Sequence, residues 1–555
     1  MLEDIDNVIS KAKAVCLTAL SVAALSAAAS SSFDVVEEMV PMSDGVRLYT
    51  CMVRPPAGVK CPIVVTRNPY VKDERFDLEK FARGHAEGFR RGYAYIEQHC
   101  RGCGMSEGDW IPYDSERTDG LAMLEWVRRL PWYNGEIFVE GSSYLASVHW
   151  AYLDTNPPDV KGACLSVQEV DRYNIAYRNG FFKIGLHGGW FVKGYKKKNL
   201  TLPRNKAVSM AEFPLADFSR RYWGAPQPAF DNVVMHPRRD DPFWRSHETG
   251  SGAEFRRALM DSTMPVLLRT SFYDIYTEGV CGMWRETPRS RLANCALLID
   301  AYDHGGRLAK DMEGTSGEFP GGSRAEERVS PVDWFDYCRT GRPCANAAPG
   351  RVRYYALWEN KWHEGDAVED GARRVDLPLG TGVRKWTYDP KRPLPEFPGP
   401  GGICFGGMRR QPPPDFRDDV VSFVMPPMEE RLDVRGRMRA RLAVSSDCED
   451  TCFYMRVSVR KPDGKWYLLR DDITSLCADG RDHAPGAEAF VYFSFADHAF
   501  RLEKGDCLRV DVSSGNSQFA PHGNVKGVQA EVGEPKTAHN SVRADASTLT
   551  LFVYK

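Results

Sequence analysis

The first third of the chain alternates short apolar runs with stretches whose apolar residues recur at helical spacing. Residues 62–66 (PIVVT) and 92–98 (GYAYIEQ) have the β-branched and aromatic composition of strands that are buried on both faces. Residues 117–130 place apolar side chains on one helical face, and residues 136–140 (EIFVE) form another strand-like run. Strands that alternate with helices in this way predict a parallel sheet and an α/β architecture.

The strand rhythm stops between about residues 172 and 261, where the chain is aromatic, basic and helix-prone. We interpret this stretch as a helical insertion, because residues 264–270 (MPVLLRT) and 296–300 (ALLID) restore the buried-strand pattern after it. From about residue 349 onward, short alternating runs separated by turns predict an all-β sandwich or jelly roll.

These changes of pattern divide the 555 residues into more than one domain, as their number alone suggests at about 100–200 residues per domain. The predicted segments are an N-terminal extension (1–34), the first part of the α/β domain (35–170), a helical cap insertion (171–263), the second part of the α/β domain (264–348) and a jelly-roll β-sandwich (349–555).

Composition narrows the class of function. Hydrophobic residues make up 43% of the chain and charged residues 27%, which is ordinary for a globular protein. The 73 basic and 75 acidic residues leave a net charge of −2, so no general field attracts nucleic acid or an anionic membrane. We therefore expect neither a nucleic-acid nor a membrane partner and look for function in individual sites.

The cysteines and the N-terminus bear on the compartment. The 15 cysteines are odd in number and scattered from Cys16 to Cys507, which is typical of reduced thiols in a cytoplasmic protein. The uncharged residues 14–29 are too short for the about 20 residues that span a bilayer. They resemble the apolar region of a signal peptide, although acidic residues precede them. Cytoplasmic location is the prediction, and export is the alternative.

The sharpest chemical motif is residues 141–146 (GSSYLA), which directly follow the predicted strand 136–140 and precede a helical stretch. A serine on a tight strand-to-helix turn is the nucleophile elbow of α/β-hydrolases, where the helix N-terminus offers N–H groups to an oxyanion. The spacing selects Ser143, two residues after Gly141. An ordinary serine at a helix N-cap is the alternative interpretation.

An α/β-hydrolase also needs an acid and a histidine after the serine, each in a loop that follows a strand. Asp274 follows the predicted strand 264–270, and His304 follows the predicted strand 296–300. The order Ser143, Asp274, His304 is therefore the one that this fold requires.

Taken together, these motifs resemble the CocE/NonD hydrolases, the peptidase S15 group of bacterial cocaine esterase, α-amino acid ester hydrolases and X-Pro dipeptidyl peptidases. The resemblance covers roughly residues 35–530 and implies an α/β-hydrolase domain with a helical cap and a C-terminal jelly roll. The matching blocks are residues 40–48, 67–70, 101–108, 131–135, 141–145, 236–244, 272–274, 303–305, 386–390, 443–447 and 508–514.

The resemblance also implies roles for individual residues. Ser143 matches the nucleophile, His304 the general base and Asp274 the residue that orients the histidine. Tyr70 matches the family tyrosine whose phenol donates to the oxyanion, and the backbone N–H of Tyr144 would be the second donor. Removing one such donor typically costs about 10²–10³ in rate.

Two positions depart from the family pattern. His99 stands where the family usually has an aspartate, and we interpret the change as altered packing. Members that act on α-amino acyl groups carry acidic residues shortly after the catalytic aspartate. Here Asp274 is followed by three uncharged residues and only then by Glu278, which disfavours a free-amine substrate and favours a neutral acyl group.

The sequence therefore predicts a serine hydrolase that cleaves a carboxylic ester or amide through an acyl-enzyme. An X-Pro dipeptidyl peptidase or α-amino acid ester hydrolase is the alternative within the class, and an inactive ligand-binding scaffold is the alternative outside it. The expected partner is a small ester, amide or short peptide, and homodimerisation is left open. We expect no cofactor or metal, because Cys100 and Cys103 have zinc-like spacing without a second pair.

Overall fold

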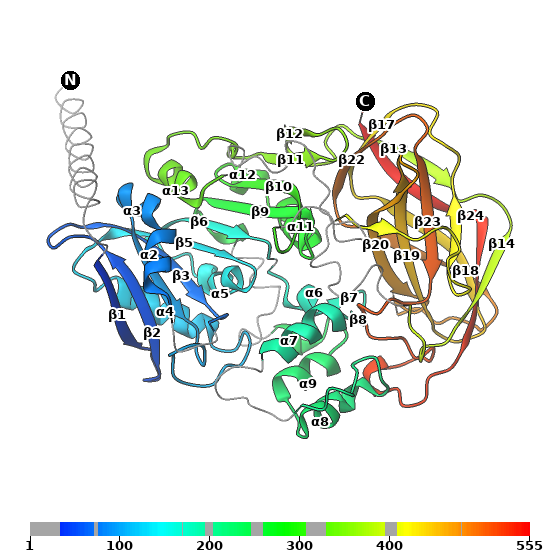
Figure 1. Cartoon of the computed structure of the whole chain (residues 1–555), viewed down its shortest axis with the longest axis horizontal. Helices are drawn as coiled ribbons and strands as arrows, with labels where there is room; N and C mark the ends of the chain where they lie inside the picture. The colour runs from blue at the N-terminus through cyan, green and yellow to red at the C-terminus, as the bar shows by residue number, and fades with distance from the viewer. Residues whose placement is uncertain are drawn as a thin grey trace.

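The computed structural model describes residues 34–71, 76–168, 170–194, 204–245, 259–306, 329–394, 408–478 and 480–554. Residues 1–33, which hold Cys16 and the signal-like segment 14–29, lie outside this part of the chain. Figure 1 shows three parts of the molecule. A sheet with its covering helices lies on the left, a β-sandwich lies on the right, and a group of short helices lies between the two at the bottom of the view. No helix within these described ranges is long and apolar enough to cross a membrane.

The α/β domain contains a ten-stranded sheet in the order β1-β2-β4-β3-β5-β6-β9-β10-β11-β12. Strands β4 to β11 of that order pair in parallel, and the strands at the two edges pair antiparallel. The predicted buried strands overlap β3, β4, β5, β9 and β10, with the runs 92–98 and 264–270 each beginning two residues before the observed strand. The strand bounds are β1 (Asp34–Pro41), β2 (Arg47–Arg54), β3 (Cys61–Asn68), β4 (Ala94–His99), β5 (Tyr133–Ser142), β6 (Val160–Ser166), β9 (Val266–Tyr273), β10 (Ala296–Asp303), β11 (Val352–Ala356) and β12 (Lys361–Gly365).

Helices cover this sheet as the α/β pattern predicts. Helix α5 packs against β5 and β3, α4 packs against α5, α11 against β9, and α13 against β6. The helix bounds are α2 (Leu78–Gly84), α3 (Ala86–Arg90), α4 (Glu116–Val127), α5 (Tyr144–Leu153), α11 (Thr277–Glu286), α12 (Arg289–Leu292) and α13 (Pro331–Thr340). Parallel strands put all their carboxyl ends at one edge, so the loops after β3, β5, β9 and β10 meet there.

The sheet continues past the boundary expected at residue 348. Strand β11 pairs in parallel with β10, and β12 pairs antiparallel with β11. The alternating sequence pattern of β11 and β12 resembles that of the β-sandwich strands. Only the pairing of β11 with β10, and of β12 with β11, assigns these two strands to the first sheet. The isolated bridge between Leu357 and Phe500 then connects the end of β11 to the sandwich.

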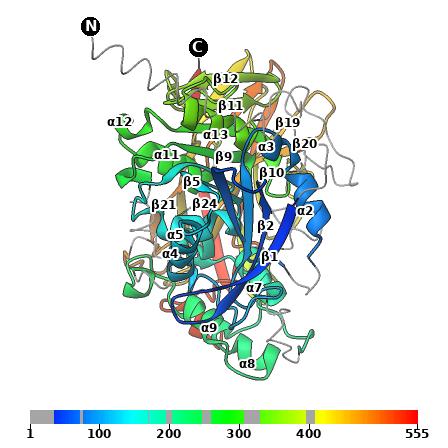
Figure 2. The same ribbon diagram turned by 90° about the vertical axis from the view of Figure 1, so that its left-hand side faces the viewer.

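The insertion is largely helical, as predicted, and has an apolar core of its own. Aromatic side chains of the segment pack on one another, among them Tyr177, Phe191, Phe218, Trp223 and Phe230. Figure 2 shows α7, α8 and α9 together at one side of the molecule, away from α13 and β12. The described elements are α6 (Arg172–Ala176), β7 (Tyr177–Arg178), β8 (Phe181–Phe182), a π-helical turn (Ile184–Gly188), α7 (Gly189–Gly194), α8 (Phe218–Trp223) and α9 (Pro228–Met235), with short 3₁₀ turns at Leu215–Asp217 and Pro242–Arg245.

The C-terminal part is a sandwich of two antiparallel sheets, which confirms the predicted β-rich class. One sheet has the order β21-β18-β24-β17-β22, with β13 and β14 also paired to the long strand β24, and the other has the order β15-β20-β19-β23-β16. The bounds are β13 (Arg373–Pro378), β14 (Val383–Tyr388), β15 (Arg410–Gln411), β16 (Val421–Val424), β17 (Leu432–Gly436), β18 (Arg439–Ser446), β19 (Cys452–Arg460), β20 (Trp466–Ser475), β21 (Glu488–Ser494), β22 (His498–Leu502), β23 (Cys507–Ser513) and β24 (Ala538–Tyr554), with a 3₁₀ turn at Gln529–Glu531.

Candidate active site

Ser143 occupies the sharp turn between β5 and α5. Its backbone has φ 57° and ψ −132°, a conformation that a residue with a side chain rarely adopts. The turn also needs glycine at position 141, because a Cβ there would lie 2.3 Å from the Leu145 carbonyl oxygen. The Ser143 N–H donates to the Ser166 carbonyl at 2.9 Å, which ties the turn to β6. Of the two adjacent serines, the structure therefore places Ser143 at the strained position.

Asp274 and His304 meet Ser143 at the carboxyl edge of the sheet. The His304 Nε2 atom lies 3.0 Å from the Ser143 Oγ atom, and Nδ1 lies 2.6 Å from the Asp274 Oδ2 atom. The other oxygen of the Asp274 carboxylate accepts the Tyr276 N–H at 2.7 Å, so both oxygens are held. The three residues predicted from their order along the chain thus form one continuous chain of hydrogen bonds.

The Asp274 carboxylate sets the protonation behaviour of His304. Burial alone would lower the pKa of the imidazole, but the negative charge and hydrogen bond of Asp274 raise it, and the net pKa lies above the ordinary histidine value. The carboxylate also fixes the ring so that Nδ1 carries the hydrogen and Nε2 faces the serine. The arrangement can accept a proton from Ser143 near neutral pH.

Tyr70 and the Tyr144 amide face each other beside the serine. The Tyr70 hydroxyl lies 3.5 Å from the Ser143 Oγ atom. The residue is 41% exposed overall, and its hydroxyl points toward Ser143 and Trp190. Burial raises the pKa of the phenol, and hydrogen bonds with Ser143, Trp190 and the Tyr144 N–H oppose that shift. The two donors predicted for an oxyanion therefore lie at one place, next to the serine oxygen.

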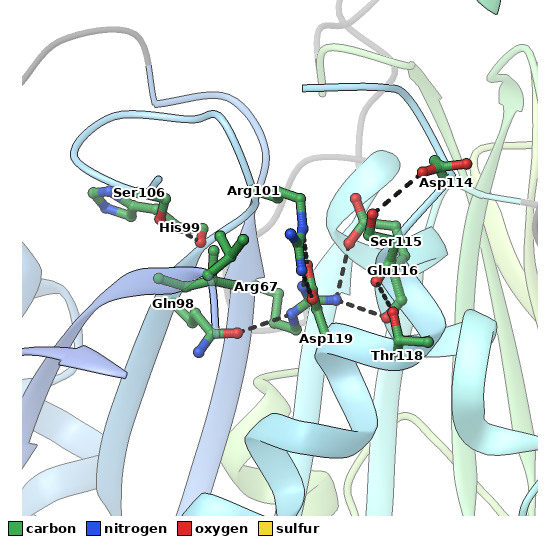
Figure 3. A network of polar contacts seen from close by, with 12 residues as sticks. Arg67, Gln98, His99, Arg101, Ser106, Asp114, Ser115, Glu116, Thr118 and Asp119 are labelled. Carbon is green, nitrogen blue, oxygen red and sulfur yellow. Dashed lines mark hydrogen bonds and ion pairs between the residues drawn. The ribbon is translucent and has the colours of Figure 1, made fainter. Parts of the chain in front are cut away.

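The buried ion pair between Arg67 and Glu116 holds the Tyr144 side chain in place. Glu116 accepts the Tyr144 hydroxyl at 3.0 Å through one oxygen and the Arg67 Nη1 atom at 2.9 Å through the other. Figure 3 shows Arg67 on its strand pointing at α4, with Gln98 on one side and Glu116 and Asp119 on the other. Sequence reasoning assigned no role to Glu116 or Arg67. A charged residue directly after the apolar run of strand β3 was the available signal.

His99 lies in an aromatic environment rather than in that ion-pair network. Its ring centroid is 4.6 Å from that of Tyr49 and 5.0 Å from that of Phe76, and the side chain is fully buried. A Cβ on Gly104 would come within 2.6 Å of the His99 ring, so the turn is packed closely around it. These contacts agree with the interpretation of the histidine as a packing change.

Glu278, the first acid after Asp274, is already neutralised. Its carboxylate forms an ion pair with Arg178 of the insertion. The Arg178 Nε atom also donates to the Asp472 Oδ1 atom of the sandwich at 2.7 Å. A carboxylate engaged in this way is poorly suited to receive a substrate ammonium.

An aromatic cluster that the sequence did not reveal stands beside the serine. Trp190 of α7 reaches over from the insertion and contacts the Tyr144 ring at 5.4 Å between centroids and the Tyr113 ring at 5.9 Å. The Tyr113 and Tyr144 rings are 4.4 Å apart. The insertion therefore contributes part of the wall of the site.

Cysteine takes no part in this arrangement. The 13 cysteines of the described ranges are free thiols, and Cys100 and Cys103 are both buried. In those ranges, no group of three or more His, Cys, Asp or Glu side chains is placed to hold a metal ion.

Two family models match the chain. The X-Pro dipeptidyl-peptidase (S15 family) model covers residues 44–306, and the X-Pro dipeptidyl-peptidase C-terminal non-catalytic domain model covers residues 349–549. Cocaine esterase from Rhodococcus sp. (strain MB1 Bresler) is 25% identical over 496 residues, which is 79% of this chain and 82% of that protein.

Solved structures share the fold over almost the whole chain. An α-amino acid ester hydrolase superposes with a TM-score of 0.76 at 20% identity and covers 94% of this chain and 97% of its own. An aminopeptidase from a marine sediment Thaumarchaeota archaeon has the same TM-score of 0.76 at 18% identity, with the same 94% and 97% coverage. A CocE/NonD family hydrolase from Staphylococcus aureus has a TM-score of 0.62 at 16% identity and covers 93% of each chain.

Proposed function

Because the chain belongs to the S15 family of X-Pro dipeptidyl-peptidase-like serine hydrolases, we propose that it is an esterase that uses Ser143, His304 and Asp274 as its catalytic triad. The observation that carries this proposal is the hydrogen-bond chain from the Ser143 Oγ atom through His304 to Asp274. The strained turn at Ser143 supports it, since a backbone held in a rarely populated conformation is typical of functional sites.

The proposed reaction has two halves. Ser143 Oγ attacks the ester carbonyl carbon while His304 Nε2 takes the hydroxyl proton, and the carbonyl oxygen becomes an oxyanion held by the Tyr70 hydroxyl and the Tyr144 N–H. The carbon–oxygen bond to the alcohol then breaks, and the alcohol leaves with the proton from His304. Water repeats the attack on the acyl-enzyme, His304 again moves the proton, and the carboxylic acid is released with Ser143 restored.

An ester is favoured over an X-Pro peptide because of the charges around the site. Cleavage after an N-terminal dipeptide requires a place for the free ammonium, and a carboxylate is the usual partner. Glu278 follows Asp274 most closely among the acids, and it is paired with Arg178. The arrangement therefore favours substrates without an amine.

A direct comparison of two chromogenic substrates tests this proposal. We expect p-nitrophenyl butyrate to be hydrolysed with a kcat/KM at least about tenfold above that for Ala-Pro-p-nitroanilide, since the Glu278 carboxylate that could receive the ammonium is already paired with Arg178. Release of p-nitroaniline faster than p-nitrophenol would assign the X-Pro activity instead. Failure to cleave either, with no labelling by a fluorophosphonate probe, would identify an inactive scaffold.

The pH dependence of kcat/KM should report His304. Activity is expected to rise with pH through the pKa of the imidazole, because only its neutral form accepts the serine proton. Since Asp274 raises that pKa, the midpoint should lie above about 6.5. In Asp274→Asn, burial remains and the raising charge is lost, so the midpoint should move to lower pH while kcat falls by about 10³–10⁴.

The matched control for that profile is Asp154→Asn. Asp154 pairs with Arg117 at the far end of α5 from Ser143, so its replacement should leave the midpoint in place. If the midpoint does not shift in Asp274→Asn, a group other than His304 controls the pH dependence of kcat/KM.

A further inference from the structure

Arg172 is a buried cation that the proposed reaction does not use. It begins α6 in the insertion and is 4% exposed. Its guanidinium carbon lies 3.5 Å from the centroid of the Tyr113 ring, so the two groups are stacked. The Arg172 Nη1 atom lies 3.5 Å from the His187 Nε2 atom. Burial, and then the Arg172 charge, hold the pKa of His187 well below its ordinary value, so His187 is neutral and adds no counter-charge.

The Arg172 guanidinium forms no ion pair with any residue in the described ranges, and its hydrogen-bond contact there is the long one to His187. Arginine is rarely buried unless it is paired, because removing the charge from water is costly. Four other buried arginines follow that rule, and a fifth is held by hydrogen bonds to the backbone instead. Ion pairs with carboxylates hold Arg67, Arg435, Arg456 and Arg509, and backbone carbonyls accept from Arg470.

Arg172 stands among the side chains that surround the proposed triad. The Tyr113 ring beneath it contacts Tyr144, the residue after the serine. On the other side, His187 stacks on Trp190 with 5.8 Å between centroids, and Trp190 in turn faces the Tyr70 hydroxyl.

Arg172 also lies near the histidine side of the triad. Tyr276 lies close enough to interact electrostatically with Arg172, and its ring contacts His304 at 5.5 Å. The guanidinium is thus enclosed by groups that touch the serine, the oxyanion donors and the histidine.

The carboxylates of the site do not supply the missing counter-charge. Glu116 is shared between Arg67 and Tyr144, and Asp274 is held by His304 and the Tyr276 N–H. Asp171, the residue before Arg172, pairs with Arg239. Each carboxylate already has its own cation or hydrogen-bond donors.

We propose that Arg172 recognises a carboxylate on the substrate, so that the preferred ester carries a negative charge in its acyl or its alcohol part. A guanidinium stacked on a ring keeps its N–H groups in the plane beyond the ring, and that edge matches the two oxygens of a carboxylate. The proposal rests on the proposed esterase function and names its substrate class. The same charge repels an ammonium, in keeping with the preference for esters over X-Pro peptides.

Two pairs of esters test this recognition and show whether the recognised charge belongs to the acyl part or to the alcohol part of the substrate. The acyl pair is the mono-p-nitrophenyl ester of glutaric acid and its methyl-capped counterpart, and the alcohol pair is 4-acetoxybenzoate and its methyl ester. In the wild-type protein, we expect kcat/KM for the charged member of one pair to exceed that of the neutral member by about tenfold or more. The pair that shows the preference identifies the charged part.

Substitution of Arg172 assigns that preference to its charge. In Arg172→Met, the ratio of charged to neutral kcat/KM should fall by about tenfold or more, and Arg172→Lys should retain part of the preference. The matched control is Arg128→Met, which removes an arginine paired with Asp159 at the opposite end of β5 from Ser143 and should keep the wild-type ratio. Glutarate should inhibit the wild-type protein competitively, and glutaramide should not, which tests the site without any variant.

Several outcomes would overturn the inference while leaving the esterase proposal intact. They are equal rates within both pairs, an unchanged ratio in Arg172→Met, or glutaramide inhibiting as well as glutarate. Absence of hydrolysis of all four esters together with absence of fluorophosphonate labelling would instead remove the esterase function itself.

Discussion

Replacing Ser143 with alanine is expected to lower kcat for an ester by at least about 10⁴-fold and to abolish labelling by a fluorophosphonate. The variant loses the atom that attacks the carbonyl, and the remaining oxyanion donors give only a small residual rate. The fold should survive, because the Ser143 backbone bonds to Ser166 and within α5 do not involve the side chain.

The chain supplies its own control for this experiment, since an exposed serine precedes the candidate nucleophile. Ser142→Ala removes a hydroxyl from the adjacent residue, and the hydroxyl that faces His304 belongs to Ser143. We expect Ser142→Ala to keep both labelling and turnover. Labelling that persists in Ser143→Ala and disappears in Ser142→Ala would reverse the assignment, and activity in the double variant would exclude both serines.

Tyr70→Phe should lower kcat by about 10²–10³-fold with a smaller effect on KM, which corresponds to about 2.7–4 kcal/mol of lost transition-state stabilisation. The phenol lies 3.5 Å from the serine oxygen and beside the Tyr144 N–H, where negative charge would develop on the substrate. The substitution leaves the ring in place, so the wall of the site is kept. Single-turnover and steady-state hydrolysis of p-nitrophenyl butyrate measure the change.

The control for this experiment is Tyr133→Phe, which removes a tyrosine hydroxyl away from the proposed oxyanion position. Tyr133 begins β5, at the end of the strand opposite Ser143, and its hydroxyl donates to Asp159 at 2.7 Å. We expect Tyr133→Phe to keep kcat near the wild-type value. A loss in Tyr70→Phe that appears only in KM would show that the phenol binds the ground state rather than the oxyanion.

The most predictable part of the site came from local sequence patterns. Alternation of apolar runs and helical segments located β3, β5, β9 and β10, and each candidate residue lies within a few residues after the end of one of these strands. The glycine at position 141 could be recognised because a strand-to-helix turn of this kind leaves no space for a side chain there. The chemistry of Ser143, Asp274 and His304 follows from residue type and order along the chain.

Other parts could not be predicted because their partners are distant along the chain. Glu116 and Arg67 are separated by two helices and a strand, and nothing in either segment shows that both support Tyr144. The pairing of β11 with β10 could not be predicted for a similar reason, since it is a contact between segments about 50 residues apart on either side of residue 348. Neither periodicity nor residue type encodes such a pairing.

The sequence by itself determined the α/β class, the β-rich C-terminal part and the residue types that can perform acyl transfer, because these depend on local periodicity and on motifs at strand ends. Only the tertiary structure decided which charges are neutralised. Glu278 is paired with Arg178, whereas Arg172 is buried beside the proposed triad without an ion pair among the described residues. The physical reason is that the effect of a charge depends on its distance to other charges and on its exclusion from water, and both arise only when remote segments pack together.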